Sequence, residues 1–469
     1  MTRIKKIPSV KYAKSVVRNI LLLACCLAVT FGSNSFAADS GGQLRKVGVA
    51  RIDITPAYAV RLTGYAIRKT ESEGVAQRLW AKALALGSDR EHPALIITVD
   101  NCGVPANVHD EVVARLKRAR RIVPERIAIC SSHTHCGPML KGFAPNIFGT
   151  PLPPDQQERV ERYTRELTDA LEAVACKALD ARRPATLTRG VGQAGFAANR
   201  RTKGGPVDHD LPAMFVTAPD GTLRAVFASY ACHCTTLGGE FNQICGDWAG
   251  FAQEAIERAH PGATALIAIG CAGDANPNPR NSLELAREYG REIATAVDTI
   301  LAGNLAPVDG KLTCRTKQLE LLFDTLPTRA EWEARAKETN YAGSHARLNL
   351  ARLERGETLP TQLPYQVQTW TFGKGLLVVF LPGEVVVDYS LRLKREFDVS
   401  RLWINAYAND VPCYIPSRRI WREGGYEGGG AMIFYDRPTR LAEGTEDLII
   451  AAVHKLAPKT FLARPGTTK

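Results

Sequence analysis

The sequence predicts an α/β protein with mixed sheets and flanking helices. Apolar runs of strand length alternate with amphipathic segments of helical length, which is the order expected for a sheet covered by helices. Polar side chains, three histidines among them, directly follow several of these runs, where α/β sheets gather their functional groups. No internal repeat or low-complexity segment interrupts this pattern.

Hydrophobic periodicity and turn residues give the expected elements in chain order. The expected strands span residues 46–55, 79–86, 94–99, 127–130, 213–217, 224–230, 263–269 and 313–323, followed by a hairpin within 366–382. The expected helices span residues 109–121, 154–179, 250–259, 283–301 and 385–395, with a charged helical excursion at 329–355. A linker is expected at 302–309. The glycine-rich stretch 423–430 is expected to be a loop without regular structure.

The first 37 residues are expected to be a signal peptide that is removed on export. Six lysines and arginines precede the apolar run 20–31, and Ser35-Phe36-Ala37 fits a small-x-small cleavage site. No stretch of the chain reaches the roughly 18 apolar residues of a membrane span. A lipoprotein box at 22–25 is the alternative, but it falls too early in the apolar run. We therefore expect a periplasmic or secreted protein, with residues 38–469 as one domain.

Charge and cysteine content argue against two classes of protein. The net charge of +12 includes the six cations of the first 37 residues, so residues 38–469 carry +6. No basic run is interleaved with aromatic residues, and nucleic-acid binding is therefore not expected. Ten cysteines remain after residue 37 without a CxxC pair, which argues against a structural zinc module. Most of them are expected to be small buried hydrophobes.

The stretch Ser131-Ser132-His133-Thr134-His135-Cys136-Gly137-Pro138 is the strongest candidate for chemistry. It follows the apolar strand 127–130. Its two imidazoles either project to one side of a strand or splay around one point on a loop. The alternative is structural, with one histidine in a turn and the other satisfied in the core.

Two other strand ends carry groups of the same kind. Strand 224–230 leads into His233, and the apolar run 376–380 leads into Glu384. Two imidazoles and a carboxylate make a catalytic zinc set that leaves a fourth position for water. Asp247, at the start of a helix, either caps that helix or accepts the second ring N–H of a metal-bound histidine. The loop 270–279 follows another strand, and its polar residues are either functional or turn chemistry only.

These segments resemble the catalytic domain of neutral (non-lysosomal) ceramidases, zinc amidases that cleave the N-acyl bond of ceramide. The resemblance spans residues 46–450. SSHTHCGP looks like the family's H-T-H-S-G-P motif, and FASYACHC looks like its strand before a zinc-binding histidine. ICGDWAGFA is similar to S-G-D-N-K-G-Y-A, and FLPGE is similar to V-P-G-E. Tyr414 and the YEGG beginning at Tyr426 match a tyrosine and a Y-E-G-G motif at the family's spacing.

The resemblance implies roles for individual residues and a metal site on strand-end loops. The implied zinc ligands are His133, His233, Glu384 and Tyr414. The residues implied to contact substrate or stabilise an oxyanion are His135, Tyr426 and Arg200, the last in a segment similar to the family's N-R-S. A guanidinium suits this role because it stays charged and can fork onto an oxyanion.

Two departures from the family pattern bear on function. The family's G-D-x-S-P-N carries the serine proposed as nucleophile, whereas this chain has Asn276 at that position. An amide cannot attack a carbonyl, although it can orient water or substrate. The family also carries a C-terminal β-domain, and this sequence ends soon after its catalytic-domain match.

The sequence therefore predicts an exported zinc-dependent hydrolase that resembles neutral ceramidase. It would cleave an amide (N-acyl) or ester bond of a small-molecule or lipid substrate with zinc-activated water, which would place it in sphingolipid metabolism. One alternative is a catalytically inactive, ceramidase-like binding protein. Another is a metal-dependent esterase or amidase that acts on a non-lipid substrate.

Overall fold

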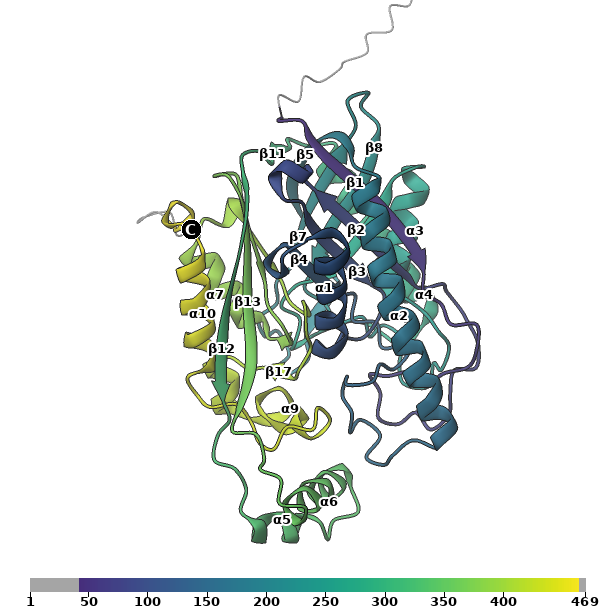
Figure 1. Ribbon diagram of the computed structural model, residues 1–469, viewed down its shortest axis with the longest axis vertical. Helices are drawn as coiled ribbons and strands as arrows, with labels where there is room; N and C mark the ends of the chain where they lie inside the picture. The colour runs from purple at the N-terminus through teal and green to yellow at the C-terminus, as the bar shows by residue number, and fades with distance from the viewer. Residues whose placement is uncertain (1–41, 464–469) are drawn as a thin grey trace, which may run out of the picture. The chain divides into compact units, whose positions relative to one another are not determined.

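Two β-sheets with helices on their outer faces make up the structure (Figure 1). It is a computed structural model that describes residues 42–463. The predicted α/β class with mixed sheets is confirmed. The predicted signal peptide lies outside the described residues, and the assignment of 38–469 to one domain stays a prediction.

The larger sheet is mixed and has parallel pairs at both of its edges. Its strands, in spatial order, are β4 (Ile127–Ser131), β3 (Ala94–Val99), β2 (Trp80–Leu86), β1 (Arg45–Asp53), β5 (Arg183–Gln193), β7 (Asp210–Thr217), β8 (Leu223–Tyr230) and β9 (Thr264–Ile269), with β11 (Ala306–Pro307) paired to β5. Only β3–β4 and β8–β9 run parallel. The helices α1 (Ala106–Arg120) and α3 (Asp247–Ala259) connect these two pairs as crossovers.

The smaller sheet repeats this arrangement once. Its strands, in spatial order, are β12 (Leu312–Leu322), β13 (Gln362–Phe372), β14 (Leu376–Phe380) and β16 (Leu402–Asn405). Only β14 and β16 run parallel, and α7 (Val387–Glu396) connects them. Two short ribbons complete the strands: β6 (Ala197–Asn199) with β10 (Ala275–Pro277), and β15 (Glu384–Val385) with β17 (Tyr414–Ile415).

The inner faces of the two sheets pack on one another through an apolar layer. Phe227 of β8 stacks on Trp403 of β16 with ring centroids 4.7 Å apart, and Trp370 and Phe372 of β13 belong to the same buried cluster. Such stacked aromatic pairs contribute about 1 kcal/mol beyond the area they bury. The outer face of the larger sheet packs against α1, α3, α2 (Pro154–Asp180) and α4 (Leu283–Leu301). On the smaller sheet, α7 and α10 (Thr445–Leu456) take this place (Figure 1).

Several elements differ from those expected. Strand β16 and helix α10 were not predicted, and the expected linker at 302–309 contains β11. Strand β5, which contains Gly190 and Gly192, was not predicted. Both lie under Ile300 of α4, where a Cβ at Gly190 would come within 2.3 Å of that side chain. The excursion 329–355 is two helices, α5 (Arg329–Arg335) and α6 (Tyr341–Glu354), because the Asn340 side chain caps the second.

The prediction that residues 423–430 lack regular structure is wrong. Helix α8 (Arg418–Glu423) ends there, and a single turn, α9 (Gly425–Gly428), follows it. Gly424 and Gly425 join the two with φ angles of 69° and 76°, a conformation that favours glycine. The glycines therefore connect helices instead of preventing them.

The cysteines of the described residues agree with the expectation that most of them are buried. The ten cysteines between residues 42 and 463 are free, and eight of them are buried, as expected for small hydrophobes. Within the same residues, no helix combines the length and the apolar character that crossing a membrane requires.

Candidate metal centre

The loops after three strands bring His133, His233 and Glu384 together. His133 follows β4, His233 follows β8, and Glu384 opens β15 shortly after β14. These strands belong to the three parallel pairs, whose carboxyl ends collect functional groups. The Nε2 atoms of His233 and His133 lie 2.9 and 3.3 Å from Oε2 of Glu384. All three side chains are buried.

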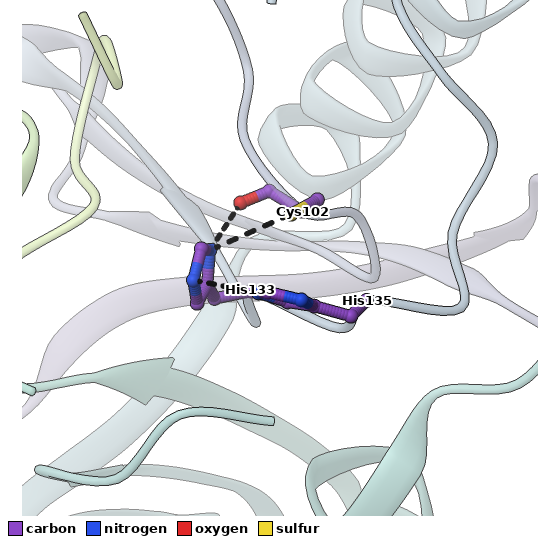
Figure 2. Close-up of side chains that lie close together, drawn as sticks. All are labelled: Cys102, His133 and His135. Atoms are coloured by element: carbon purple, nitrogen blue, oxygen red, sulfur yellow. Dashed lines mark hydrogen bonds between the residues drawn. The ribbon is translucent and has the colours of Figure 1, made fainter. Parts of the chain in front are cut away.

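Backbone carbonyls fix the tautomers of the two histidines. Nδ1 of His133 lies 2.5 Å from the carbonyl oxygen of Cys102, as Figure 2 shows, and Nδ1 of His233 lies 2.7 Å from that of Ala272. A carbonyl oxygen only accepts hydrogen bonds, so each Nδ1 carries the proton and donates it. In the neutral ring, the lone pair then sits on Nε2 and faces Glu384.

This donor set fits a divalent cation. Burial, the Arg200 guanidinium and His133 lower the pKa of His233 to about 4, so its ring is neutral at neutral pH. Burial opposes ionisation of Glu384, but the two histidines hold the pKa of its carboxyl well below the ordinary value. Two ring nitrogens and a carboxylate oxygen thus converge on one buried point. A divalent cation at this point could be bound by all three atoms, and nitrogen and oxygen ligands suit zinc.

Cys102, His133 and His135 form a second group of ligand-type atoms that lie close together (Figure 2). The sulfur of Cys102 is 3.8 Å from Nδ1 of His133, the nitrogen already committed to a carbonyl. Burial and the charge of Glu384 raise the pKa of the Cys102 thiol well above its ordinary value, so it stays protonated. The set of His133, His233 and Glu384 is therefore the better candidate.

Tyr414, the fourth ligand implied by the resemblance, lies beside this set. Parallel pairing of β15 with β17 places Glu384 opposite Tyr414. The Tyr414 hydroxyl is 3.4 Å from Nε2 of His233 and accepts a hydrogen bond of 3.0 Å from Nη2 of Arg200. The four implied ligands are 30 to 281 positions apart in the sequence, yet the structure brings them to one centre.

Tyr435 is a functional candidate that sequence reasoning missed. Its buried hydroxyl donates a short hydrogen bond to Oε1 of Glu384, the carboxylate oxygen that does not face the histidines. Such partners orient metal ligands and tune their basicity. Tyr435 follows a 3₁₀ turn at Gly430–Ile433 and belongs to no motif, so no sequence signal marks it.

His135 lies at the boundary between this cluster and an open cavity. Its Nε2 is 3.2 Å from Nε2 of His133, and its Nδ1 is buried without a hydrogen-bond partner. Burial and the neighbouring histidines lower its pKa well below the ordinary value, so the ring is neutral at neutral pH. Gly64, with φ of 89°, packs on this ring, and a Cβ there would come within 2.4 Å of it.

Asp247 does not accept from a metal-bound histidine, but its carboxylate accepts a hydrogen bond of 2.6 Å from the backbone N–H of Trp248 in the first turn of α3. The second ring nitrogen of His233 is taken by Ala272, and the residue that precedes α3 is Gly246. The carboxylate of Asp247 accepts from the backbone N–H groups of Thr236 and Leu237, at 3.3 and 2.9 Å. It therefore fixes the loop that follows His233.

The remaining predicted residues line an open cavity of about 640 Å³ next to the cluster. Its lining residues are Gly64, Tyr65, His135, Arg200, Arg201, Thr202, Thr235, Asn276, Arg280, Tyr414, Tyr426 and Glu427. Asn276 lies on β10 and accepts a hydrogen bond of 3.3 Å from the Thr235 hydroxyl. Tyr426 is 46% exposed and packs edge-on against Tyr414. His135, Arg200, Asn276 and Tyr426 thus share one solvent-accessible space.

Fold and site together define a mixed α/β protein with a buried candidate metal centre beside a polar cavity. Residues 46–149 match the family model described as neutral/alkaline non-lysosomal ceramidase, N-terminal. Curated neutral ceramidases from Drosophila pseudoobscura pseudoobscura and Drosophila melanogaster are each 23% identical, over 50% and 53% of this chain. The matched segments span 36% and 38% of those proteins.

Two solved structures share the fold. A ceramidase complexed with C2 has a TM-score of 0.70 at 18% identity and covers 91% of this chain and 78% of its own. The neutral ceramidase from Pseudomonas aeruginosa has a TM-score of 0.69 at 20% identity, with 88% and 75% covered. The chain is a distant homologue of the neutral/alkaline ceramidases, and the predicted resemblance is confirmed.

Proposed function

We propose that this chain is an exported zinc-dependent hydrolase of an amide (N-acyl) or ester bond. The observation that carries the proposal is the convergence of two imidazole nitrogens and one carboxylate oxygen, all buried. His133, His233, Glu384 and Tyr414 would hold the ion. When bound, zinc supplies a Lewis acid that polarises a carbonyl and lowers the pKa of water.

The surrounding residues supply proton transfer and charge stabilisation. His135 is neutral and opens on the cavity, so its Nε2 takes a proton from the attacking water and returns it to the leaving group. Arg200 and Tyr426 are the donors for the oxyanion, since both line the cavity. Glu427 accepts a 2.7 Å hydrogen bond from Nε of Arg200 and so orients its guanidinium.

Asn276 excludes a covalent route through its position. An amide side chain has no nucleophilic oxygen at neutral pH, but it offers one acceptor and two donor hydrogens. Its Oδ1 already accepts from Thr235, so its NH₂ group remains to orient water or substrate. Water is therefore the nucleophile in this proposal.

The polar lining of the cavity favours a non-lipid substrate over ceramide. Its lining residues, given above, contain no aliphatic side chain, whereas sites for long acyl chains are predominantly apolar. The homology to ceramidases supports an N-acyl bond as the bond that is cleaved. The polar cavity lining supports a substrate that is more polar than ceramide. A substrate series with increasing acyl chain length separates the two, because a lipid enzyme gains activity with length.

The test is hydrolysis of N-acyl and ester substrates by purified protein, before and after chelation and zinc reconstitution. We expect activity that a chelator abolishes and zinc restores, with no covalent acyl-enzyme in mass spectra. Zinc binding without hydrolysis of any substrate would instead support the inactive binding protein. Activity that survives removal of all metal would refute the proposal.

A further inference from the structure

The cavity beside the candidate metal centre carries an excess of positive charge. Three guanidinium groups line it, from Arg200, Arg201 and Arg280, against one carboxylate, from Glu427. That carboxylate is already shared, because Oε1 accepts from Arg200 at 2.7 Å and Oε2 accepts from Arg201 at 2.5 Å. Arg280 is left without a counter-charge in the cavity.

Arg280 has unused hydrogen-bonding capacity. Its one hydrogen bond within residues 42–463 runs from Nη2 to the hydroxyl of Tyr65, at 2.9 Å. Its Nε is buried and has no partner. No described carboxylate lies within 4 Å of its guanidinium, whereas Arg201 contacts both Glu427 and Glu423. Nη1 of Arg280 makes no hydrogen bond within the described residues and, unlike Nε, is not buried, so it is free to donate to a ligand in the cavity.

Tyr65 connects Arg280 to the residue proposed to transfer protons. Its hydroxyl donates to the carbonyl of Leu237 at 2.7 Å and therefore acts as acceptor toward Arg280. The Tyr65 ring packs edge-on against the His135 ring with centroids 4.8 Å apart. An anion on Arg280 would thus lie one tyrosine away from His135, within the reach of a small substrate.

We propose that Arg280 binds an anionic group of the substrate, namely a carboxylate, sulfonate or phosphate. The planar guanidinium offers a fork of donors that matches two oxygens of such a group. The inference rests on the proposed hydrolase function and narrows its substrate class to small, negatively charged N-acyl or ester compounds. It also accounts for a cavity without aliphatic lining.

A matched substrate series tests the charge requirement on the amine side. The anionic members are N-acetylglycine, N-acetyltaurine and N-acetyl-O-phosphoethanolamine, and N-acetylethanolamine is the neutral member. N-succinylethanolamine against N-butanoylethanolamine tests the acyl side. We expect kcat/KM of the zinc-loaded protein to be about 10- to 100-fold higher for at least one anionic member, the range for a charged hydrogen bond. The preferred member identifies the anionic group.

Variants assign this preference to one side chain. Arg280→Gln should lower kcat/KM for the anionic member about 10- to 100-fold more than for the neutral member, whereas Arg280→Lys should keep part of the preference. Arg287→Gln is the matched control, because it removes the same charge from exposed Arg287 on α4, outside the cavity lining. Equal loss with neutral and anionic members in Arg280→Gln would overturn the assignment.

Equilibrium binding separates this inference from the proposed reaction. Calorimetry with the same compounds, on metal-free and zinc-loaded protein, needs no turnover. We expect the anionic member to bind at least about 10-fold more tightly than the neutral one, and Arg280→Gln to abolish the difference. If the anionic and neutral compounds bind with equal affinity to both the metal-free and the zinc-loaded protein, the anion site is refuted even if hydrolysis is observed. Selective binding without hydrolysis would support the site while the proposed reaction fails.

Discussion

The buried cluster and the open cavity differ in how their polar atoms are satisfied. In the cluster, backbone carbonyls hold Nδ1 of His133 and His233, and Tyr435 holds the outer oxygen of Glu384. In the cavity, Nδ1 of His135 and Nε of Arg280 are buried without partners. Ligand atoms that are held in place by hydrogen bonds suit one small ion of defined geometry. Polar atoms without hydrogen-bond partners suit a ligand that binds reversibly.

The largest expected effect comes from removing a ligand of the cluster. Glu384→Ala or His133→Ala should weaken metal affinity by more than about 100-fold, since even outer partners of ligands contribute 10- to 100-fold. Activity should fall with it. Metal content by mass spectrometry and circular dichroism of the same samples check metal and folding together.

His109→Ala is the control for the ligand variants. His109 is a buried histidine on α1 whose side chain contacts Asp110 and lies outside the cluster. It should keep full metal content. If Glu384→Ala and His133→Ala both retain one metal ion per chain, the cluster is not the metal site.

The contact between Gly64 and His135 tests the boundary between the two regions. Gly64→Ala should keep the metal but lower kcat/KM by about 100-fold, because displacing a catalytic group by about 1 Å costs that much. Gly204→Ala is the matched control, since Gly204 also has a positive φ of 70° but nothing within 4 Å of its Cβ position. Equal activity of the two variants would contradict a role for the His135 position.

Tyr435→Phe removes a hydrogen bond that holds Glu384 in place without removing a metal ligand. Loss of the hydrogen bond to Glu384 should weaken metal affinity by about 10- to 100-fold. Tyr389→Phe removes a comparably buried hydroxyl that donates to the carbonyl of Pro416 and should leave metal affinity unchanged. Competition titrations with a chelating dye measure both. A similar loss in both variants would assign the effect to general destabilisation.

Substitution of Asp436 should have the smallest effect, a loss of folding stability that depends on pH. Burial would raise its pKa, but Arg352 and His345 lower it to about 2. Its contribution to stability is therefore full above about pH 4 and is lost as the pH falls through 2. Asp436→Asn should lower the free energy of unfolding by about 2 kcal/mol at pH 7. Urea titrations should show this difference shrinking below pH 4, and a constant difference would contradict the assignment.

The sequence predicted the centre better than its surroundings. His133, His233 and Glu384 were predictable because each polar residue directly follows an apolar strand, and the three parallel pairs place those strand ends together. The hydrogen bonds to the carbonyls of Cys102 and Ala272 were not predictable, because every residue type carries a backbone carbonyl. Tyr435 and Arg280 were not predicted either, because Tyr435 lies in a turn and Arg280 in an irregular segment, and their partners Glu384 and Tyr65 are far away in the chain.

The same limit applies to the fold. Strand β5 was missed because Gly190 serves a close approach to Ile300 of α4, a tertiary contact that overrides local propensity. The glycine-rich stretch before Gly430 was misread for the opposite reason, since its glycines connect two short helices. In both cases the backbone geometry depends on partners that local periodicity does not report.

His133 has a φ of 57°, in the left-handed region that favours glycine or asparagine. Holding an imidazole there costs about 1 to 2 kcal/mol of folding free energy. Selection for thermal stability alone would therefore favour glycine or asparagine at position 133, and neither can replace the imidazole as a metal ligand. Stability and metal binding pull this position in opposite directions, which makes it a place to look for a trade-off in evolved variants.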